Sequence, residues 1–195
     1  MPLHGKVDSS SELIPPGVHK ARCISVVDLG THKIKKYGIW IHKMMLGLEM
    51  PEVKKSDGEC FITWIPLILS MHPKYGLRLF IEYWRSKVFT DQEAEEFDIF
   101  ELLGVTAIIN VIINNGYTKI SSLILLKSSE CPERINDLIG FSLSEFDEKV
   151  FESLPKILQN KIKESIEYQC MVSEAADESV SDPDIGIEED GYLHF

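Results

Sequence analysis

The spacing of apolar residues changes near position 70, and this change constrains the fold more than any other feature of the chain. From Val18 to Leu69 the apolar residues fall in runs that suit β-strands and are separated by polar turns. From Pro73 to Lys87 they recur at helical spacing instead, as Leu77, Phe80, Ile81 and Trp84. Strand-like runs return after Gly104. The chain must therefore combine a β-sheet with at least one inserted helix.

Turn signals divide the strand-like parts into separate strands. A polar connector over residues 30–38 and the pair Asp57-Gly58 separate the first three, and Asn114-Asn115-Gly116 is a hairpin turn between the last two. Thr90-Asp91-Gln92-Glu93 fits a capping box and predicts the start of a second short helix. The predicted strands cover residues 18–29, 39–49, 59–69, 105–113 and 117–127.

Three strands, a helix and two strands is the element order of the OB-fold, a five-stranded Greek-key barrel that binds oligonucleotides or oligosaccharides. Other small β-barrels with an inserted helix share that order. Two amphipathic pieces on either side of Pro155 are expected to cap the barrel. We therefore predict a mainly β fold with helices, made of a flexible leader over 1–16, an OB-fold-like domain over 17–128, a helical extension over 129–172 and a disordered acidic tail over 173–195.

Cysteine usage and hydropathy indicate the compartment. The four cysteines are far apart in the sequence, at Cys23, Cys60, Cys131 and Cys170, and form no C-x-x-C pair. Free thiols in a reducing compartment are expected in place of disulfides or a zinc site. The first 16 residues lack the apolar core of a signal peptide, and no apolar run is long enough to cross a membrane. We expect a soluble protein of the cytoplasm, or of the host-cell cytoplasm if the protein is viral, with no membrane partner.

The common catalytic motifs are missing from the sequence. It has no H-x-x-x-H or H-E-x-x-H spacing for a metal, no G-x-S-x-G turn, no P-loop and no dinucleotide-binding glycine pattern. Paired acids such as Glu95-Glu96 fall in a charged helix, where a solvated surface is the simpler explanation. We predict a protein that is not an enzyme and has no metal or cofactor, with a nuclease or other enzyme of unfamiliar motif as an alternative.

Charge is distributed unevenly along the chain. The net charge of −11 would by itself argue against a nucleic-acid partner. Residues 18–87, however, hold twelve Lys or Arg against six Asp or Glu, whereas residues 88–172 hold seven against fifteen. The segment 173–195 has eight acids and no Lys or Arg. A basic first half joined to an acidic second half is typical of polyanion binding combined with an acidic arm.

Basic and aromatic residues alternate across the predicted second and third strands and the loops beside them. Proteins that bind single strands need cations for the phosphates and rings on which bases stack. In OB-folds this part of the sheet forms the binding face. Trp40 and Trp64 can each stack on a base or pack in the core, whereas Trp84 is predicted to be core because its neighbours on the helix stripe are apolar. The predicted nucleic-acid site is Lys20, Arg22, Lys33, Lys35, Lys36, Tyr37, Trp40, His42, Lys43, Lys54, Lys55 and Trp64.

Several short stretches between Pro15 and Tyr168 resemble bacteriophage single-stranded DNA-binding proteins of the OB-fold class. They are 16–21 (PGVHKA), 26–30 (VVDLG), 69–72 (LSMH), 84–90 (WRSKVFT), 97–98 (FD), 102–104 (LLG), 146–147 (FD) and 154–168. The resemblance implies sequence-independent binding of single-stranded DNA in phage replication or recombination. The sequence departs from a regular third strand at Pro66, which removes a backbone donor and predicts an edge or a bulge.

The resemblance also implies a function for the acidic tail. In replicative single-strand binders such a tail ends on an aromatic residue, docks onto replication or recombination proteins and competes with DNA. Here Glu188, Glu189, Asp190 and Phe195 match that pattern, with Tyr192-Leu193-His194 interrupting the acids before the end. A tail that only solubilises the protein is the alternative. A second alternative for the whole chain is an interaction module that inhibits a host factor without binding DNA, and homo-oligomerisation is left open.

Overall fold

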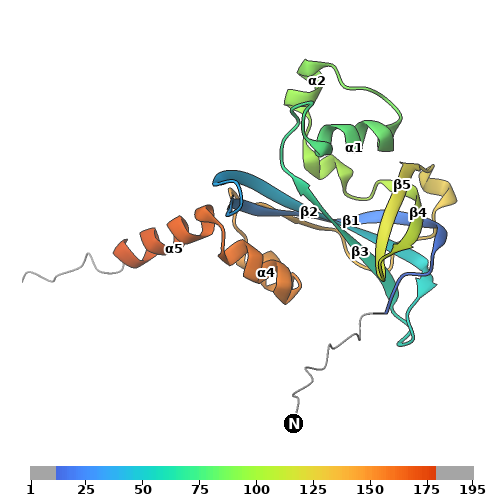
Figure 1. Cartoon of the computed structure of the whole chain (residues 1–195). Helices are drawn as coiled ribbons and strands as arrows, with labels where there is room; N and C mark the ends of the chain where they lie inside the picture. The colour runs from blue at the N-terminus through green and yellow to red at the C-terminus, as the bar shows by residue number, and fades with distance from the viewer. Residues whose placement is uncertain (1–11, 179–195) are drawn as a thin grey trace, which may run out of the picture.

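A computed structural model describes residues 12–178 of the chain, and its centre is a six-stranded sheet (Figure 1). Five strands follow the order β3-β2-β1-β4-β5, all antiparallel to their neighbours, and the short β6 pairs with β1 in parallel. The strands are β1 (Gly17–Ile34), β2 (Ile39–Lys54), β3 (Cys60–Ile68), β4 (Thr106–Asn114), β5 (Tyr117–Leu125) and β6 (Ile139–Phe141). The predicted mainly β class with helices is confirmed.

The sheet is open in the described part of the chain. β3 and β5 are its two edges and no ladder joins them, so strand pairing does not close the OB-fold-like five-stranded barrel that the sequence predicts. Pro66 lies on the edge strand β3, opposite Met45, as its missing donor predicted. The hairpin between β4 and β5 turns at Asn115 and Gly116 with φ of 51° and 79°, which is the backbone that an Asn-Gly turn favours.

One face of the sheet packs against α1 (Gly76–Arg85) and forms the main core. Leu77, Ile81 and Trp84 of the predicted helical stripe are buried there. The Trp84 indole Nε1–H donates to the Thr106 carbonyl at 3.0 Å, so Trp84 is a core residue as predicted. α1 contacts both β5 and β3, and it therefore lies between the two unpaired edges. α2 (Asp91–Glu96) begins with the predicted capping box of Thr90 and Glu93, and the 3-10 helix η1 (Ile99–Leu102) follows.

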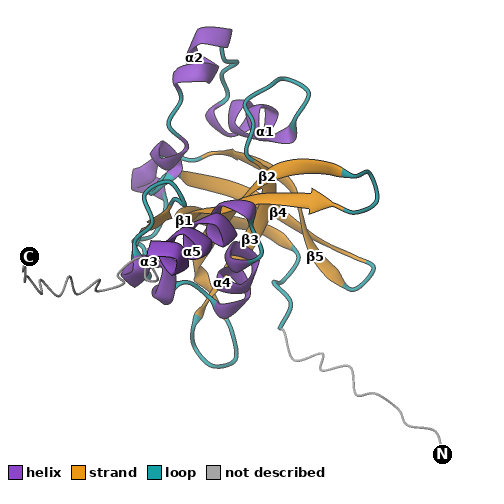
Figure 2. Cartoon of the chain, turned by 90° about the vertical axis from the view of Figure 1, so that its left-hand side faces the viewer, coloured by secondary structure: helices purple, strands orange, loops and turns teal. Residues whose placement is uncertain are grey.

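A second core lies on the other face of the sheet, where the C-terminal helices pack (Figure 2). Val27 and Leu29 of β1 and Met45 of β2 meet apolar residues of α3 (Glu148–Ser153) and α4 (Lys156–Lys163). The two cores follow from strand alternation, because Met44 and Leu46 face the first core whereas Met45 faces the second. β6 comes from the predicted helical extension, so this extension also contributes a strand to the sheet. The 3-10 helix η2 (Ser128–Glu130) begins the connection to β6.

Several boundaries differ from those expected from the sequence. β1 continues to Ile34, and only residues 35–38 form the turn before β2, because the polar residues of the expected connector pair with β2. The end of the leader is packed, since Ile14 is buried in the main core and the Glu12 carboxylate accepts hydrogen bonds from Ser56.

At the other end of the described chain, α5 (Ile166–Glu178) extends past Ser173, where disorder was expected to begin. Ala175 and Ala176 favour a helix there. No helix of the described residues is long and apolar enough to cross a membrane.

Candidate nucleic-acid interface

The β1–β2 hairpin extends beyond the rest of the sheet, and residues 31–43 are called the hairpin tip here (Figure 1). β4 pairs with β1 only as far as Arg22, and β3 pairs with β2 only from Lys43 onward. The short β6 pairs with β1 at residues 25–27, and beyond these ladders residues 31–34 and 39–42 pair only with each other, with Lys33 opposite Trp40. Gly38 closes the turn with a φ of 67°. The fold therefore presents the tip as a projecting ribbon.

Two aromatic rings of the hairpin tip are exposed and each has a lysine beside it. Tyr37 is 65% exposed and Trp40 is 54% exposed. The Lys33 ammonium lies 5.5 Å from the centroid of the Trp40 ring, and Lys36 lies 5.2 Å from that of Tyr37. Such contacts contribute only about 0.5–1 kcal/mol at exposed sites, so a ligand can replace them. Lys35 is also exposed, in the turn.

The base of the hairpin tip is tied to α5 by a polar cluster of Asp28, Thr31, His42 and Glu167. The Glu167 carboxylate accepts from the Thr31 N–H at 2.7 Å and from the Thr31 hydroxyl at 2.5 Å. His42 Nε2 lies 2.6 Å from Asp28 Oδ1, and its Nδ1 lies 3.8 Å from Glu167. Gly30 makes this approach feasible, because a Cβ at that position would lie 2.5 Å from the Ser165 Cβ. The cluster positions α5 beside the tip.

The pKa values in this cluster shift in the directions that stabilise its charged forms. The hydrogen bond to Asp28 raises the pKa of His42, against the opposing effect of burial, and the charge of Glu167 adds to the rise. Burial by itself would raise the pKa of Asp28, but hydrogen bonds from His42 and from the Gly30 N–H lower it overall. Burial likewise opposes the lowering of the Glu167 pKa by its two bonds from Thr31. His42 is thus engaged within the protein.

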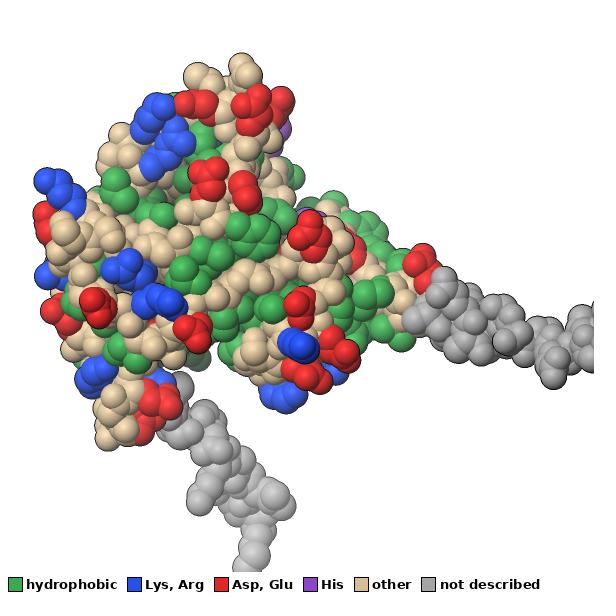
Figure 3. Space-filling model, turned by 180° about the vertical axis from the view of Figure 1, so that it is seen from behind, with side chains coloured by type: hydrophobic (Ala, Val, Ile, Leu, Met, Phe, Trp, Pro, Cys, Tyr) green, Lys and Arg blue, Asp and Glu red, His purple; other side chains and the backbone are tan. Residues whose placement is uncertain are grey.

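A groove of about 480 Å³ separates Trp40 from the start of α5. Ile166 and Cys170 of α5 line it, and carboxylates are present at Glu164 and Glu174. Seen from behind, the molecule shows apolar side chains gathered over the region from which α5 projects (Figure 3). The groove can accept a flat apolar group against the Trp40 indole. The contribution of α5 to it was not predicted from the sequence, because more than 120 residues separate Trp40 from Ile166.

Trp64 occupies a different environment from Trp40. It is half-buried and packs with the second core, next to Gly47, where a Cβ would lie 3.0 Å from the indole. The C-terminal helices cover the face of β1–β3 on which Trp64 lies. Trp64 therefore presents less ring surface to a ligand than Trp40 does. Lys43 is half-buried at a smaller pocket between the sheet and α4.

The remaining predicted residues lie away from the hairpin tip. Lys54 and Lys55 are at the other end of β2, 14 residues from Trp40, which is about 45 Å along an extended strand. Lys55 is paired with Glu59 at 3.1 Å. Arg22 donates to the carbonyls of Gly104 and Pro132, at 3.1 and 3.2 Å.

The predicted set is therefore divided into two groups. Lys20 is exposed on β1, opposite Ile108 of β4, and so lies outside the tip. The tip group consists of Lys33, Lys35, Lys36, Tyr37, Trp40, His42 and Lys43. The predicted partner-binding residues Glu188, Glu189, Asp190 and Phe195 lie outside the described residues.

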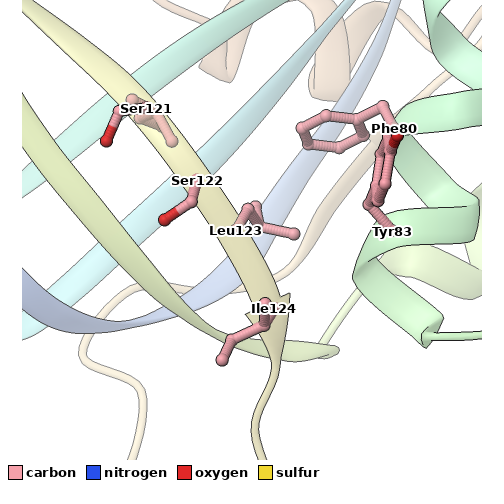
Figure 4. A pocket seen from close by; sticks show the side chains of 7 residues that line it. Phe80, Tyr83, Ser121, Ser122, Leu123 and Ile124 are labelled. Atoms are coloured by element: carbon pink, nitrogen blue, oxygen red, sulfur yellow. The ribbon is translucent and has the colours of Figure 1, made fainter.

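A second surface feature is an apolar groove of about 420 Å³ between α1 and β5 (Figure 4). Phe80 and Tyr83 of α1 face Leu123 of the edge strand β5, the adjoining Ile124 also lines the groove, and Tyr83 is 72% exposed. No basic residue lines this groove, which sets it apart from the hairpin tip. It has the composition of a protein-docking surface more than that of a phosphate site.

The described residues bring together no three His, Cys, Asp or Glu side chains in an arrangement that could hold a metal ion. All four cysteines are free; Cys23, Cys60 and Cys131 are buried, and Cys170 is exposed. Burial raises the pKa of the Cys23 thiol to about 12, so this group is unreactive. Comparisons with protein-family models, with curated proteins and with solved structures found no match.

Proposed function

We propose that this chain binds single-stranded DNA without sequence preference, as the phage proteins that its sequence resembles do. The observation that carries the proposal is the exposed Trp40 ring with the Lys33 ammonium above it, on a ribbon that also carries Tyr37, Lys35 and Lys36. A base that stacks on an aromatic side chain contributes about 1–3 kcal/mol, whichever base it is. Lysines around the ring supply the phosphate contacts that make such binding strong at low salt.

The strand order of the sheet supports this proposal, because it is compatible with an OB-fold. β1 pairs with both β2 and β4, and α1 lies between the third and fourth strands, so the sheet is compatible with a partly open OB-fold barrel. The C-terminal helices cover much of the outer face that such folds use for ligands. In the proposed complex the DNA therefore follows the hairpin tip and the groove beside α5. His42, which is hydrogen-bonded within the protein, holds the tip in place and makes no contact with DNA.

The tail is assigned a role in the same proposal. Its acids would compete with DNA for the lysines of the tip, and Glu188, Glu189, Asp190 and Phe195 would recruit replication or recombination proteins. The chain is proposed to work without catalysis, metal or cofactor, in the host-cell cytoplasm, during phage DNA replication or recombination.

Titration with oligo-dT, followed by tryptophan fluorescence, tests the proposal. Binding should weaken steeply as salt rises, and Trp40→Ala should weaken it about tenfold or more at constant salt. Tyr83→Ala removes an even more exposed ring from the α1–β5 groove and should leave the affinity unchanged. A chain that ends at Glu178 should bind more tightly if the tail competes. Absence of binding, or binding indifferent to both salt and Trp40, would refute the proposal.

The α1–β5 groove favours one alternative, an interaction module that captures a host protein. The exposed edge of β5 beside an apolar groove suits an added strand from a partner. That function predicts no affinity for oligo-dT and the loss of the protein complex in Tyr83→Ala.

A further inference from the structure

A pocket of about 260 Å³ lies between the sheet and α4, next to the hairpin tip. Its floor is apolar and comes from Leu29 and Met45, which are buried, and from Pro66 on the edge strand. Its polar groups are Lys43, His32 and Lys161, with one carboxylate, that of Glu164. His32 comes from β1 and the two lysines come from β2 and α4, so only the folded chain brings these groups together.

The two lysines of this pocket, like the other lysines of the hairpin tip, take part in no ion pair within the described part of the chain. Lys43 is half-buried as a residue and lines the pocket, so its ammonium is placed to meet an anionic ligand there. His32 donates its Nε2–H to the Leu29 carbonyl at 2.9 Å, which leaves Nδ1 available to a ligand. Two lysines against the one carboxylate of Glu164 leave the pocket with a net positive charge that an anionic ligand would balance.

The volume of the pocket, its lining and its position beside the Trp40 groove indicate which kind of anion it would bind. An apolar floor with cations at the rim matches a nucleotide, whose base and sugar can lie on the floor while its phosphate meets the lysines. The volume is below the usual range for larger ligands, about 300–1,000 Å³, so it suits one nucleotide. Glu164 lines both this pocket and the Trp40 groove, so the two sites are neighbours.

We propose that this pocket holds one nucleotide of the bound strand, with its phosphate at Lys43 and Lys161, while a nearby base stacks on Trp40. This inference rests on the proposed function and extends it to two residues that sequence reasoning missed, His32 and Lys161. The pocket does not discriminate between bases, because its floor has no hydrogen-bonding side chain that could match a base edge. It fixes the path of the strand between the tip and α4.

The test compares Lys43→Gln/Lys161→Gln with the wild type and with Lys149→Gln, an exposed lysine of α3 away from the pocket. The affinity for oligo-dT is measured over a range of salt concentrations. Each lost phosphate contact should reduce the slope of log affinity against log salt by about 0.7, hence by about 1.4 for the double variant. Lys149→Gln should retain the wild-type slope. Circular dichroism verifies that the variants are folded.

A second measurement uses thymidine monophosphate with methyl NMR. The signal of Met45 should shift with the nucleotide, shift less with thymidine, which lacks the phosphate, and stay unchanged in the double variant. The pocket proposal would be refuted, and the proposed function left intact, by a wild type that binds oligo-dT together with either of two results. One is an unaltered salt slope in the double variant, and the other is a Met45 methyl signal that does not shift with the nucleotide. A wild type that binds no oligo-dT would overturn the proposed function itself.

Discussion

The two ends of β2 have similar compositions but differ in how their polar groups are satisfied. At the hairpin tip, Lys33 and Lys36 lie beside aromatic rings that face solvent. At the other end, Lys55 is paired with Glu59. There the buried Glu49 carboxylate accepts from the backbone N–H groups of Ile135 and Asn136, at 2.9 and 2.8 Å. A lysine count treats both ends alike, whereas the contacts leave only the tip with rings and cations that a ligand can use.

The largest effect is expected at the far end, from Glu49→Ala. The substitution leaves two backbone N–H groups and the Asn136 side chain without their acceptor, which should lower the free energy of unfolding by about 3 kcal/mol. Glu59→Ala removes only an exposed ion pair and should cost no more than about 0.5 kcal/mol. Urea denaturation of both variants measures the contrast. Equal losses would show that Glu49 does not hold the 135–136 segment.

The comparison of the two ends is tested directly with matched pairs of lysines. Lys33→Gln/Lys36→Gln and Lys54→Gln/Lys55→Gln make the same change in net charge. The tip variant should lower the salt slope of oligo-dT binding by about 1.4, at about 0.7 for each contact, and the far-end variant should leave it unchanged. Equal reductions in the two variants would mean that overall charge, and not the tip, attracts the DNA.

The smallest effect is expected from the pH dependence of stability that His42, Asp28 and Glu167 cause at the base of the hairpin tip. Because the folded pKa of His42 is raised above its ordinary value of 6.5, its stabilisation is complete below that value and is lost as pH rises through the folded pKa. The lowered pKa values of Asp28 and Glu167 make their contributions disappear at the acid end, as pH falls through those folded values. The contribution of these three charged groups to the stability of the fold is therefore largest in mildly acidic solution.

Thermal unfolding of the wild type and of His42→Gln between about pH 5 and pH 9 measures this effect. The wild type should have the higher Tm near the acid end of that range, and its advantage over His42→Gln should shrink toward the alkaline end. A difference that is constant across the range would show that the histidine acts by packing and not by charge.

Local signals in the sequence located most of the elements. The alternation of apolar residues, the helical stripe of α1, the capping box at Thr90 and the Asn115-Gly116 turn each depend on a few neighbouring residues. β6 was missed because three residues are too few to show a period. The extension of β1 to Ile34 was missed because its polar residues are stabilised by pairing with β2.

The candidate site was predictable only in part, for a related reason. Aromatic and basic residues close together in the sequence identified the tip, because a hairpin keeps such neighbours together in space. The groove beside Trp40 and the pocket of Lys43 and Lys161 depend on α4 and α5, which follow the hairpin by more than 110 residues. Sequence spacing carries no information on contacts of that range.

The sequence by itself therefore determined the mainly β class, the helix between the third and fourth strands, the core role of Trp84 and the concentration of rings and lysines near Trp40. Each of these depends on local periodicity or composition. Only the tertiary structure decided that β3 and β5 remain edges, that Trp64 is covered while Trp40 is exposed, and that Lys54 and Lys55 are far from the tip. The contrast between Trp64 and Trp40 depends on which face the C-terminal helices bury, and the other two outcomes depend on which strands pair and how long they are. Burial and strand pairing are both settled by packing across the whole chain.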